Sequence, residues 1–393
     1  MSCRQAHHLI VVLVMLLSAS VFAGGRARYG GTLSVTAVTT STDLDPLLAD
    51  TPVDAALVGL TSTPLCRLVE LSRPTPSTLR LTTTSVSEVT KTLARVRAEP
   101  SPYRALLANV KSISTGTTSI ELTLEGPAPA LEKSLCHPAL SVPIAPYVKN
   151  RANARHPEGR PYPDALALQR TDARTAERLL SQHRTHLVLG SATATDAPQL
   201  FATYVLVPKN PALRQAIEAT TERADLTRFF VRPPATPMFG LLPPALGGPT
   251  VAPPRAAKPP VQSPPREVTL TFDKSSDDHR AIAEKLQVKL QLLGFRLSFR
   301  AVTRADLRAT WAAGGSELML QTVLLPPVPG AALDVLTELS LQGQARPPMP
   351  PAELELIPLC VQALGVSTSR ELQHLTRDAM GLPRLDDVFL ASE

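Results

Sequence analysis

The sequence predicts an α/β fold with a doubly wound, parallel lobe, and three observations within residues 267–323 support this prediction. Residues 268–272 and 295–299 alternate apolar and polar side chains, which is the period of a half-buried strand. Residues 282–293 place apolar side chains at helical spacing, and residues 317–323 read as a third strand after a short helix. Strands joined through helices of this length run parallel.

The same unit predicts where a ligand binds. Short polar side chains in Asp273–Asp278 supply turn and N-cap chemistry before the first helix, and Gly294 follows its end. Open parallel sheets bind ligands beyond the carboxyl ends of their strands. The expected rim of a site is therefore Asp273–Asp278, Ala301–Thr303 and Leu324–Gly330.

Other elements follow from the same patterns. In the first half of the chain we expect strands at residues 32–38, 78–83 and 119–124, and helices at 54–60, 87–97, 103–110 and 128–136. Later we expect short strands at residues 165–168 and 187–189 around a helix at 173–183, a helix at 212–221 after the Asn210-Pro211 start signal, and a further helix containing Leu226.

A proline-rich stretch divides the chain. Twelve prolines lie between Pro233 and Pro265, and proline lacks the amide donor that a helix or a central strand needs. Met238 and Leu241 are too apolar for a disordered linker, so we expect an extended, ordered connection between lobes. From Leu354 to Leu390 the sequence indicates a short strand and turns.

Length and charge bound the number of domains and argue against one class of function. The 393 residues suit two domains or one large two-lobed body, and net charge is +6, or +5 without Arg4 of the leader described next. No lysine–arginine run occurs and aromatic residues make up only 4% of the chain. Both observations argue against nucleic-acid binding.

The first 23 residues resemble a secretory signal. A short polar start precedes the apolar run Leu9–Leu17, and Val21-Phe22-Ala23 fits a cleavage site. The run is short for a membrane span, although an uncleaved anchor is the alternative. Cys3 precedes the run, so it is not a lipid acceptor. We expect cleavage after Ala23 and an unlipidated periplasmic protein.

Export leaves three cysteines, Cys66, Cys136 and Cys360. One disulfide with one free thiol and three buried thiols are both open readings, and their apolar neighbours favour buried structural cysteines.

The sequence gives no support for an enzyme. It contains no G-x-S-x-G, S-x-x-K, H-E-x-x-H or phosphate-binding G-x-x-x-x-G-K motif. His183 and His186 lack further ligands nearby, and Cys136-His137 are adjacent residues that point apart on a helix. An Asp-Pro turn explains Asp45. No cofactor and no metal are expected.

Short motifs in order along the chain resemble the family 5 extracellular solute-binding proteins, the dipeptide- and oligopeptide-binding type that serves ABC importers. The matching segments are Tyr29–Leu33, Leu44–Pro46, Ser101–Tyr103, Ile120–Leu124, His137–Leu140, Gly159–Tyr162, Arg214–Ala216, Ile282–Gln287, Ile357–Leu359 and Leu385–Asp387. Each segment is short, and together they extend over nearly the whole mature chain.

The resemblance implies a two-lobed clamp of the type II periplasmic-binding-protein fold, each lobe a mostly parallel sheet flanked by helices, with ligand held between the lobes. The expected division is signal peptide 1–23, first lobe 24–49, accessory subdomain 50–150, first lobe again 151–258, second lobe 259–345 and a return to the first lobe over 346–393.

Two departures from the family pattern bear on the ligand. The Gly-Thr-Gly-Pro segment is missing between Tyr147 and Gly159, and Leu324–Val328 has no carboxylate, the first one following at Asp334. A peptide bound in the usual way buries its amino group, and a buried amine needs a charged or carbonyl acceptor. A less polar or neutral solute is therefore easier to accommodate here.

The resulting expectation is a monomeric solute-binding component of an ABC importer that captures a small peptide-like or less polar solute and delivers it to permease subunits in the inner membrane. The alternative is an accessory protein that keeps the clamp fold with a degenerate cleft. The expected ligand contacts are Thr40, Thr42, Tyr204, Gln321 and Thr322.

Overall fold

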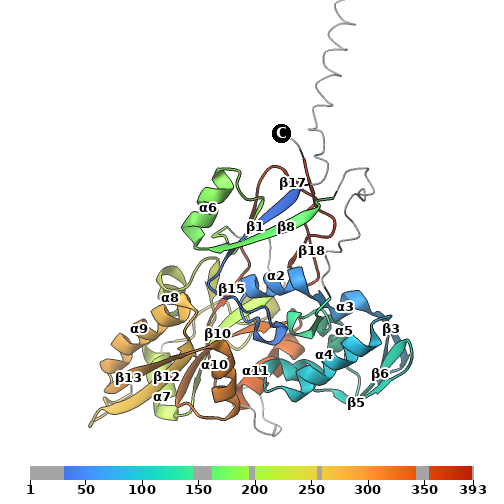
Figure 1. The fold of residues 1–393 in the computed structure, drawn as a ribbon. Helices are drawn as coiled ribbons and strands as arrows, with labels where there is room; N and C mark the ends of the chain where they lie inside the picture. The colour runs from blue at the N-terminus through green and yellow to red at the C-terminus, as the bar shows by residue number, and fades with distance from the viewer. Residues whose placement is uncertain (1–30, 145–161, 194–199, 255–258, 342–353, 392–393) are drawn as a thin grey trace, which may run out of the picture.

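The computed structural model describes residues 31–144, 162–193, 200–254, 259–341 and 354–391 (Figure 1). The expected signal peptide, the Tyr29-Gly30 match and the Gly159–Pro161 match lie outside these residues. In the part of the chain that is described, no helix is long and apolar enough to cross a membrane.

The first lobe is a small sheet, drawn at the top of Figure 1, in the strand order β16-β9-β1-β8. Strand β1 (Thr32–Val38) runs parallel to both β8 (Ala165–Thr171) and β9 (Leu187–Leu189), and β16 (Val366–Thr368) is antiparallel to β9. Helix α6 (Ala173–Ser181), capped by Asp172, joins β8 to β9. The predicted strand at 32–38 and the parallel arrangement are confirmed here.

The accessory subdomain is built on an antiparallel sheet in the order β3-β4-β6-β5. Its strands are β3 (Glu70–Thr75), β4 (Thr78–Thr82), β5 (Val110–Thr115) and β6 (Ser119–Leu124), with a short pair β2 (Thr63–Pro64) and β7 (Ser141–Val142). Its helices are α2 (Pro52–Thr61), α3 (Leu65–Leu68), α4 (Val86–Ala98) and α5 (Pro129–Ser134), with 3-10 turns η1 (Pro46–Leu48), η2 (Pro102–Leu107) and η3 (Pro138–Leu140).

One prediction for this subdomain was wrong, and one strand was missed. The helix expected at 103–110 is the shorter 3-10 segment η2, which begins at Pro102 and gives way to strand β5. Strand β3 was not predicted, because all six of its residues are exposed and show no alternation of burial. Cys66 and Cys136 form a disulfide, while Cys360 is a buried free thiol, so of the two open alternatives the structure has one disulfide with one free thiol.

The second lobe is a six-stranded mixed sheet in the order β11-β15-β10-β14-β12-β13. Strands β12 (Arg266–Asp273), β13 (Phe295–Val302) and β14 (Leu318–Leu325) are parallel, as predicted. Strands β10 (Phe201–Pro208), β11 (Ala235–Pro237) and β15 (Ile357–Gln362) form antiparallel pairs. The helices are α7 (Pro211–Thr220), α8 (Arg223–Phe229), α9 (Asp277–Gln291), α10 (Arg304–Ala312) and α11 (Pro329–Leu341).

The sheet changes the expected lobe boundaries. Strands β10, β11 and β15 belong to the second-lobe sheet, although they lie within 151–258 and 346–393, the ranges that were expected to return to the first lobe. Strand β10 pairs with β14 on one side and β15 on the other, and all eight of its residues are buried, as is typical of a central strand with both faces of the sheet covered. The described part of the proline-rich stretch likewise remains in the second lobe, where it forms the edge strand β11 and the turn η5 (Pro244–Leu246), and Met238 is buried.

The lobes meet at two crossing segments. The amides of Gly190 and Ser191 both donate to the carbonyl of Gly365, at 2.8 and 3.1 Å. A Cβ atom on Gly365 would lie 1.8 Å from the Ser191 carbonyl oxygen, so only glycine permits this approach. Beyond Gly365 the chain returns to the first lobe through β16. It ends in two short antiparallel pairs, β17 (Leu372–Gln373) with β20 (Phe389–Leu390), and β18 (Thr376–Arg377) with β19 (Pro383–Arg384).

The largest apolar core is continuous from the accessory subdomain into the second lobe. Helix α11 packs on η2 and α5, and its Val335, Leu336 and Leu339 belong to the same buried cluster as Tyr103 and Leu106. The opposite face of the second-lobe sheet has a separate core under α7 and α9. The accessory subdomain and the second lobe therefore share an interior.

Candidate functional site

A cavity of about 60 Å³ lies where the first lobe, the start of α2 and the second lobe meet. Its walls come from both lobes and from the crossing segments. They are formed by Val38–Ser41 and Thr51–Val53 on one side, by Tyr204, Arg232, Pro233, Ser275–Asp278 and Arg304 on the other, and by Gly190, Gln362 and Ala363 between them. We call this cavity the cleft.

The expected rim is confirmed at one of three places. Ser275–Asp278, which follow the end of β12, line the cleft, with Ser276 capping α9 through its hydroxyl. Ala301–Thr303 do not line it, but the next residue, Arg304, does. Leu324 and its turn pack instead against the accessory subdomain, where His137 Nε2 lies 3.1 Å from the Leu324 carbonyl oxygen.

Tyr204 lies in the cleft. Its hydroxyl donates to Asp278 at 2.8 Å and lies 3.3 Å from the Gln362 side-chain oxygen. Asp278 also accepts the Arg232 amide, at 3.2 Å. Burial, together with the negative charge of Asp278, raises the pKa of Tyr204 well above its ordinary value, so the phenol remains a neutral donor.

Two hydrogen bonds close the cleft between the lobes. Thr40 Oγ1 donates to the Ser275 carbonyl at 2.7 Å, and Arg232 Nη1 donates to the Val38 carbonyl at 2.9 Å. Thr42, two residues beyond Thr40, is exposed and lies outside the cleft lining.

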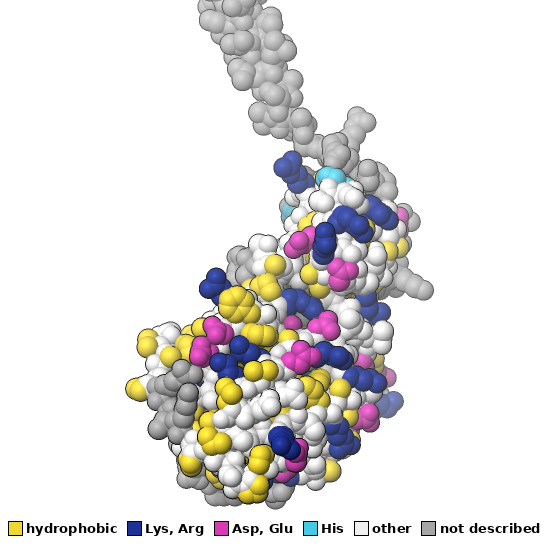
Figure 2. All heavy atoms as spheres, turned by 90° about the vertical axis from the view of Figure 1, so that its left-hand side faces the viewer, with side chains coloured by type: hydrophobic (Ala, Val, Ile, Leu, Met, Phe, Trp, Pro, Cys, Tyr) yellow, Lys and Arg dark blue, Asp and Glu magenta, His cyan; other side chains and the backbone are white. Residues whose placement is uncertain are grey.

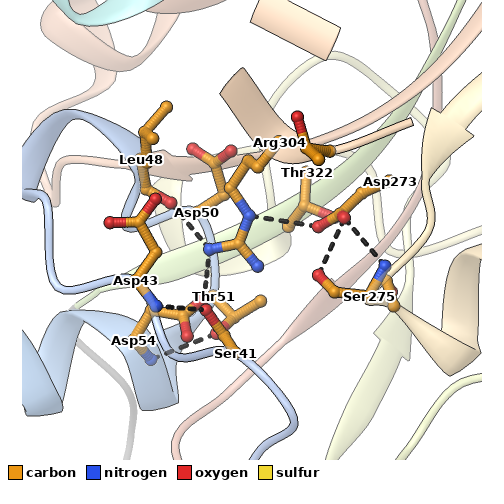
Figure 3. A network of polar contacts seen from close by, with 12 residues as sticks. Ser41, Asp43, Leu48, Asp50, Thr51, Asp54, Asp273, Ser275, Arg304 and Thr322 are labelled. Atoms are coloured by element: carbon orange, nitrogen blue, oxygen red, sulfur yellow. Dashed lines mark hydrogen bonds and ion pairs between the residues drawn. The ribbon is translucent and has the colours of Figure 1, made fainter. Parts of the chain in front are cut away.

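Arg304, on the wall of the cleft, joins the second lobe to the accessory subdomain (Figure 3). Its Nη1 donates to the Leu48 carbonyl at 2.7 Å and to Asp54 at 2.8 Å, and its Nε donates to Asp273 at 3.1 Å. Burial alone would lower the pKa of Arg304, but the attraction of Asp54 and the nearby carboxylates raises it above its ordinary value. Arg304 is therefore a permanent cation held by acceptors from the accessory subdomain and from the second lobe.

A second buried pair lies one helical turn along α10. Arg308 binds Asp50 and donates to Gln321 Oε1 at 2.9 Å. Tyr103 donates to the same Asp50 at 2.9 Å. Burial raises the pKa of Asp50 despite Arg308. Gln321, an expected ligand contact, thus serves this internal network and does not line the cleft.

Thr322 lines a smaller cavity, of about 10 Å³, on the other side of Arg304. Its hydroxyl lies 2.8 Å from Nε2 of His279, whose Nδ1 accepts the Asp273 amide at 3.3 Å. Burial lowers the pKa of His279 to about 4, so the ring is neutral and Nε2 is the donor. Of the five expected contacts, the structure therefore places Thr40 and Tyr204 in the cleft, with Thr322 behind Arg304.

Other candidate sites have structural roles. His186 Nδ1 accepts the Ser34 amide, and both His183 and His186 face Glu371 at 4.0 and 3.5 Å. Asp45 caps η1 and pairs with Arg95. Across the described residues no cluster of histidine, cysteine and carboxylate side chains could hold a metal ion.

Sequence reasoning included Asp273 in the expected rim but missed Asp54 and Arg304, its partners in the charged network. The three residues come from distant parts of the chain, and nothing in their local patterns marks them as buried partners. The available signal was position: Asp273 ends β12, and Arg304 begins the helix after β13, where ligand sites of parallel sheets lie.

Comparison with solved structures gives close matches in architecture over almost the whole chain. The murein tripeptide binding protein MppA of Escherichia coli superposes with a TM-score of 0.65 and 11% identity over 93% of this chain and all of MppA. Peptide-bound OppA of Listeria monocytogenes gives 0.64 and 11%, over 93% and 100%. AgaA of A. tumefaciens R10, bound to agropinic acid, gives 0.60 and 14%, over 92% and 99%.

The chain has the two-lobed periplasmic-binding-protein fold. The predicted fold class is confirmed, and the family resemblance is confirmed at the level of the fold. No protein-family model matches the sequence, and comparison with curated proteins gives no match. In this periplasmic-binding-protein fold the cleft lies between the lobes, as the sequence predicted, although a cavity of about 60 Å³ is much smaller than the roughly 300–1,000 Å³ of ordinary ligand pockets.

Proposed function

We propose that this protein is the solute-binding component of an ABC-type importer, exported by its first 23 residues and working in the periplasm. It captures a small solute between its lobes and passes it to permease subunits in the inner membrane. It is not an enzyme. One observation carries this proposal: a cleft lined from both lobes, with Thr40 on one side and Tyr204 and Asp278 on the other, in a chain of this fold.

Charge and surface agree with this function. Figure 2 shows Lys and Arg interspersed with Asp and Glu over the main body on the side that it displays, without a large field of one sign. Such a surface does not favour nucleic acid. Solved structures of the same fold hold a peptide in one case and agropinic acid in another, so the fold accepts chemically different small solutes.

The cleft must bind a solute in solution if the proposal is correct. A thermal-shift panel of peptides, sugars, opines and lipids should contain a compound that raises the melting temperature, because a ligand bound only by the folded state stabilises it. Asp278→Asn should reduce that shift, since Asp278 lies in the cleft, whereas Glu177→Gln on exposed α6 should retain it. Permease and ATPase genes beside this one would add independent support.

Two features of the structure favour a second candidate, an accessory protein that keeps the clamp fold with a degenerate cleft. The cleft is small, and the buried side chain of Arg304 separates it from the neighbouring cavity. The core shared by the accessory subdomain and the second lobe also limits opening between them. This candidate predicts no thermal shift with any solute and unchanged solute uptake in a strain lacking the gene.

A further inference from the structure

We propose that Arg304 is a built-in occupant of a guanidinium site in the cleft, and that a solute which displaces it must itself carry a guanidinium or ammonium group. The second half of this inference rests on the proposed function, and the first half does not. The inference implies a cationic solute, in place of the less polar or neutral solute expected from the sequence.

Three acceptors surround the guanidinium group of Arg304. The Leu48 carbonyl and Asp54 come from the segment that leads into α2 and from α2 itself, while Asp273 comes from the end of β12. All three lie within 3.1 Å of a guanidinium nitrogen. A planar guanidinium suits this arrangement because it presents several N–H donors in fixed directions.

Burial makes the site selective for charge. Asp54 is 1% exposed and Asp273 is 4% exposed. Asp54 Oδ1 has no hydrogen-bond partner among the described residues, so the site holds more acceptor capacity than Arg304 uses. Removing the cation leaves two buried carboxylates without their shared counter-ion, and another cation at the same place would compensate both.

Arg304 also sets the size of the cleft. It lines both the cavity of about 60 Å³ and the cavity of about 10 Å³ that Thr322 lines. The side chain therefore stands between the two spaces, and moving it aside would join them. A solute bearing a cation could then enter at the position that the guanidinium vacates.

Chemical rescue tests this assignment. Arg304→Ala removes the fragment that ethylguanidinium replaces, and ethylurea is its uncharged counterpart. We expect Arg304→Ala to lower the melting temperature, and millimolar ethylguanidinium to recover at least half of the loss while ethylurea does not. Wild type should respond far less, because its own tethered guanidinium competes at a high effective concentration.

Two control variants complete the experiment. Arg300→Ala, at an exposed position on β13, should keep the wild-type melting temperature and show no rescue. Arg304→Ala combined with Asp54→Asn and Asp273→Asn removes the acceptor charges, and it should lose the response to ethylguanidinium. If Arg304→Ala does not fold alone, the same two compounds are compared during refolding, with this triple variant beside it.

Three outcomes would overturn the inference: equal rescue by ethylurea, equal shifts in wild type and Arg304→Ala, or an undiminished response in the triple variant. Each is measured without a transported solute. A failed solute screen therefore leaves the rescue result standing, and a failed rescue leaves the solute screen standing.

Discussion

The phenolic oxygen of Tyr103 accepts a hydrogen bond of 3.0 Å from the backbone amide of Leu324. Tyr103 belongs to the accessory subdomain and Leu324 to strand β14 of the second lobe, and both are buried. Since the same hydroxyl donates to Asp50, one side chain joins the backbone of one lobe to the charged network at the interface.

Replacing Tyr103 with phenylalanine should lower the free energy of unfolding by about 2 kcal/mol. The buried Leu324 amide loses its acceptor and the buried Asp50 carboxylate loses one of its donors. Urea denaturation measures this change. A double-mutant cycle with Asp50→Asn should show a coupling above roughly 0.5 kcal/mol. Additive effects would mean that the hydroxyl does not act through Asp50.

Acid should destabilise the protein through His137 and His279, which are buried and have their pKa lowered to about 4 by burial. Unfolded imidazoles have a pKa near 6.5, so between pH 6.5 and 4 the unfolded state binds protons that the folded state does not. The contribution of each ring to the free energy of unfolding is therefore fully present above pH 6.5. It falls by about 3 kcal/mol for each ring as pH is lowered towards 4.

Denaturation curves from pH 7.5 to 4 check this expectation. His279→Gln should remove about half of the pH dependence, because it removes one of the two buried rings. An unchanged slope in that variant would contradict the assignment.

Reduction of the Cys66–Cys136 disulfide should destabilise the accessory subdomain. The bond joins residues 70 apart, and loop-closure entropy gives about 4 kcal/mol for a loop of this length. Denaturation with and without reductant, and of a Cys66→Ala/Cys136→Ala variant, measures the loss. Cys360→Ala, at the buried free thiol, should show no response to reductant beyond that of wild type.

Gly365→Ala should destabilise the crossing between the lobes by about 3 kcal/mol or more, because the new Cβ would overlap the Ser191 carbonyl. Gly59→Ala is the matched control. No atom lies within 4 Å of its added Cβ, and its place in α2 favours alanine by roughly 0.5–1 kcal/mol. The two melting temperatures should therefore move in opposite directions.

Local patterns predicted the parts of the fold that depend on neighbouring residues. The β12–α9–β13 unit follows from alternation and helical spacing, and Asn210 caps α7 as expected. The position of β10 in the second-lobe sheet could not be read in the same way, because its partners β14 and β15 lie more than a hundred residues away along the chain.

The same distinction between local and long-range features applies to the residues of the site. Thr40 could be placed in the cleft from its position in the loop after the first strand, Tyr204 from its place on the strand before Asn210, and Ser275–Asp278 from the rule for parallel sheets. Arg304 and Asp54 could not, because an arginine or an aspartate near a helix start is usually solvated. Only the folded chain brings these two residues to 2.8 Å, across 250 positions of sequence.

The interior that runs from η2 into α11 and β14 has a consequence for the protein's modularity. A fragment comprising the accessory subdomain alone would expose to water the apolar side chains that α11 covers. The second lobe expressed without that subdomain would expose the apolar face of α11. The two parts are therefore inseparable as folding units, and heating should melt them together in a single calorimetric transition.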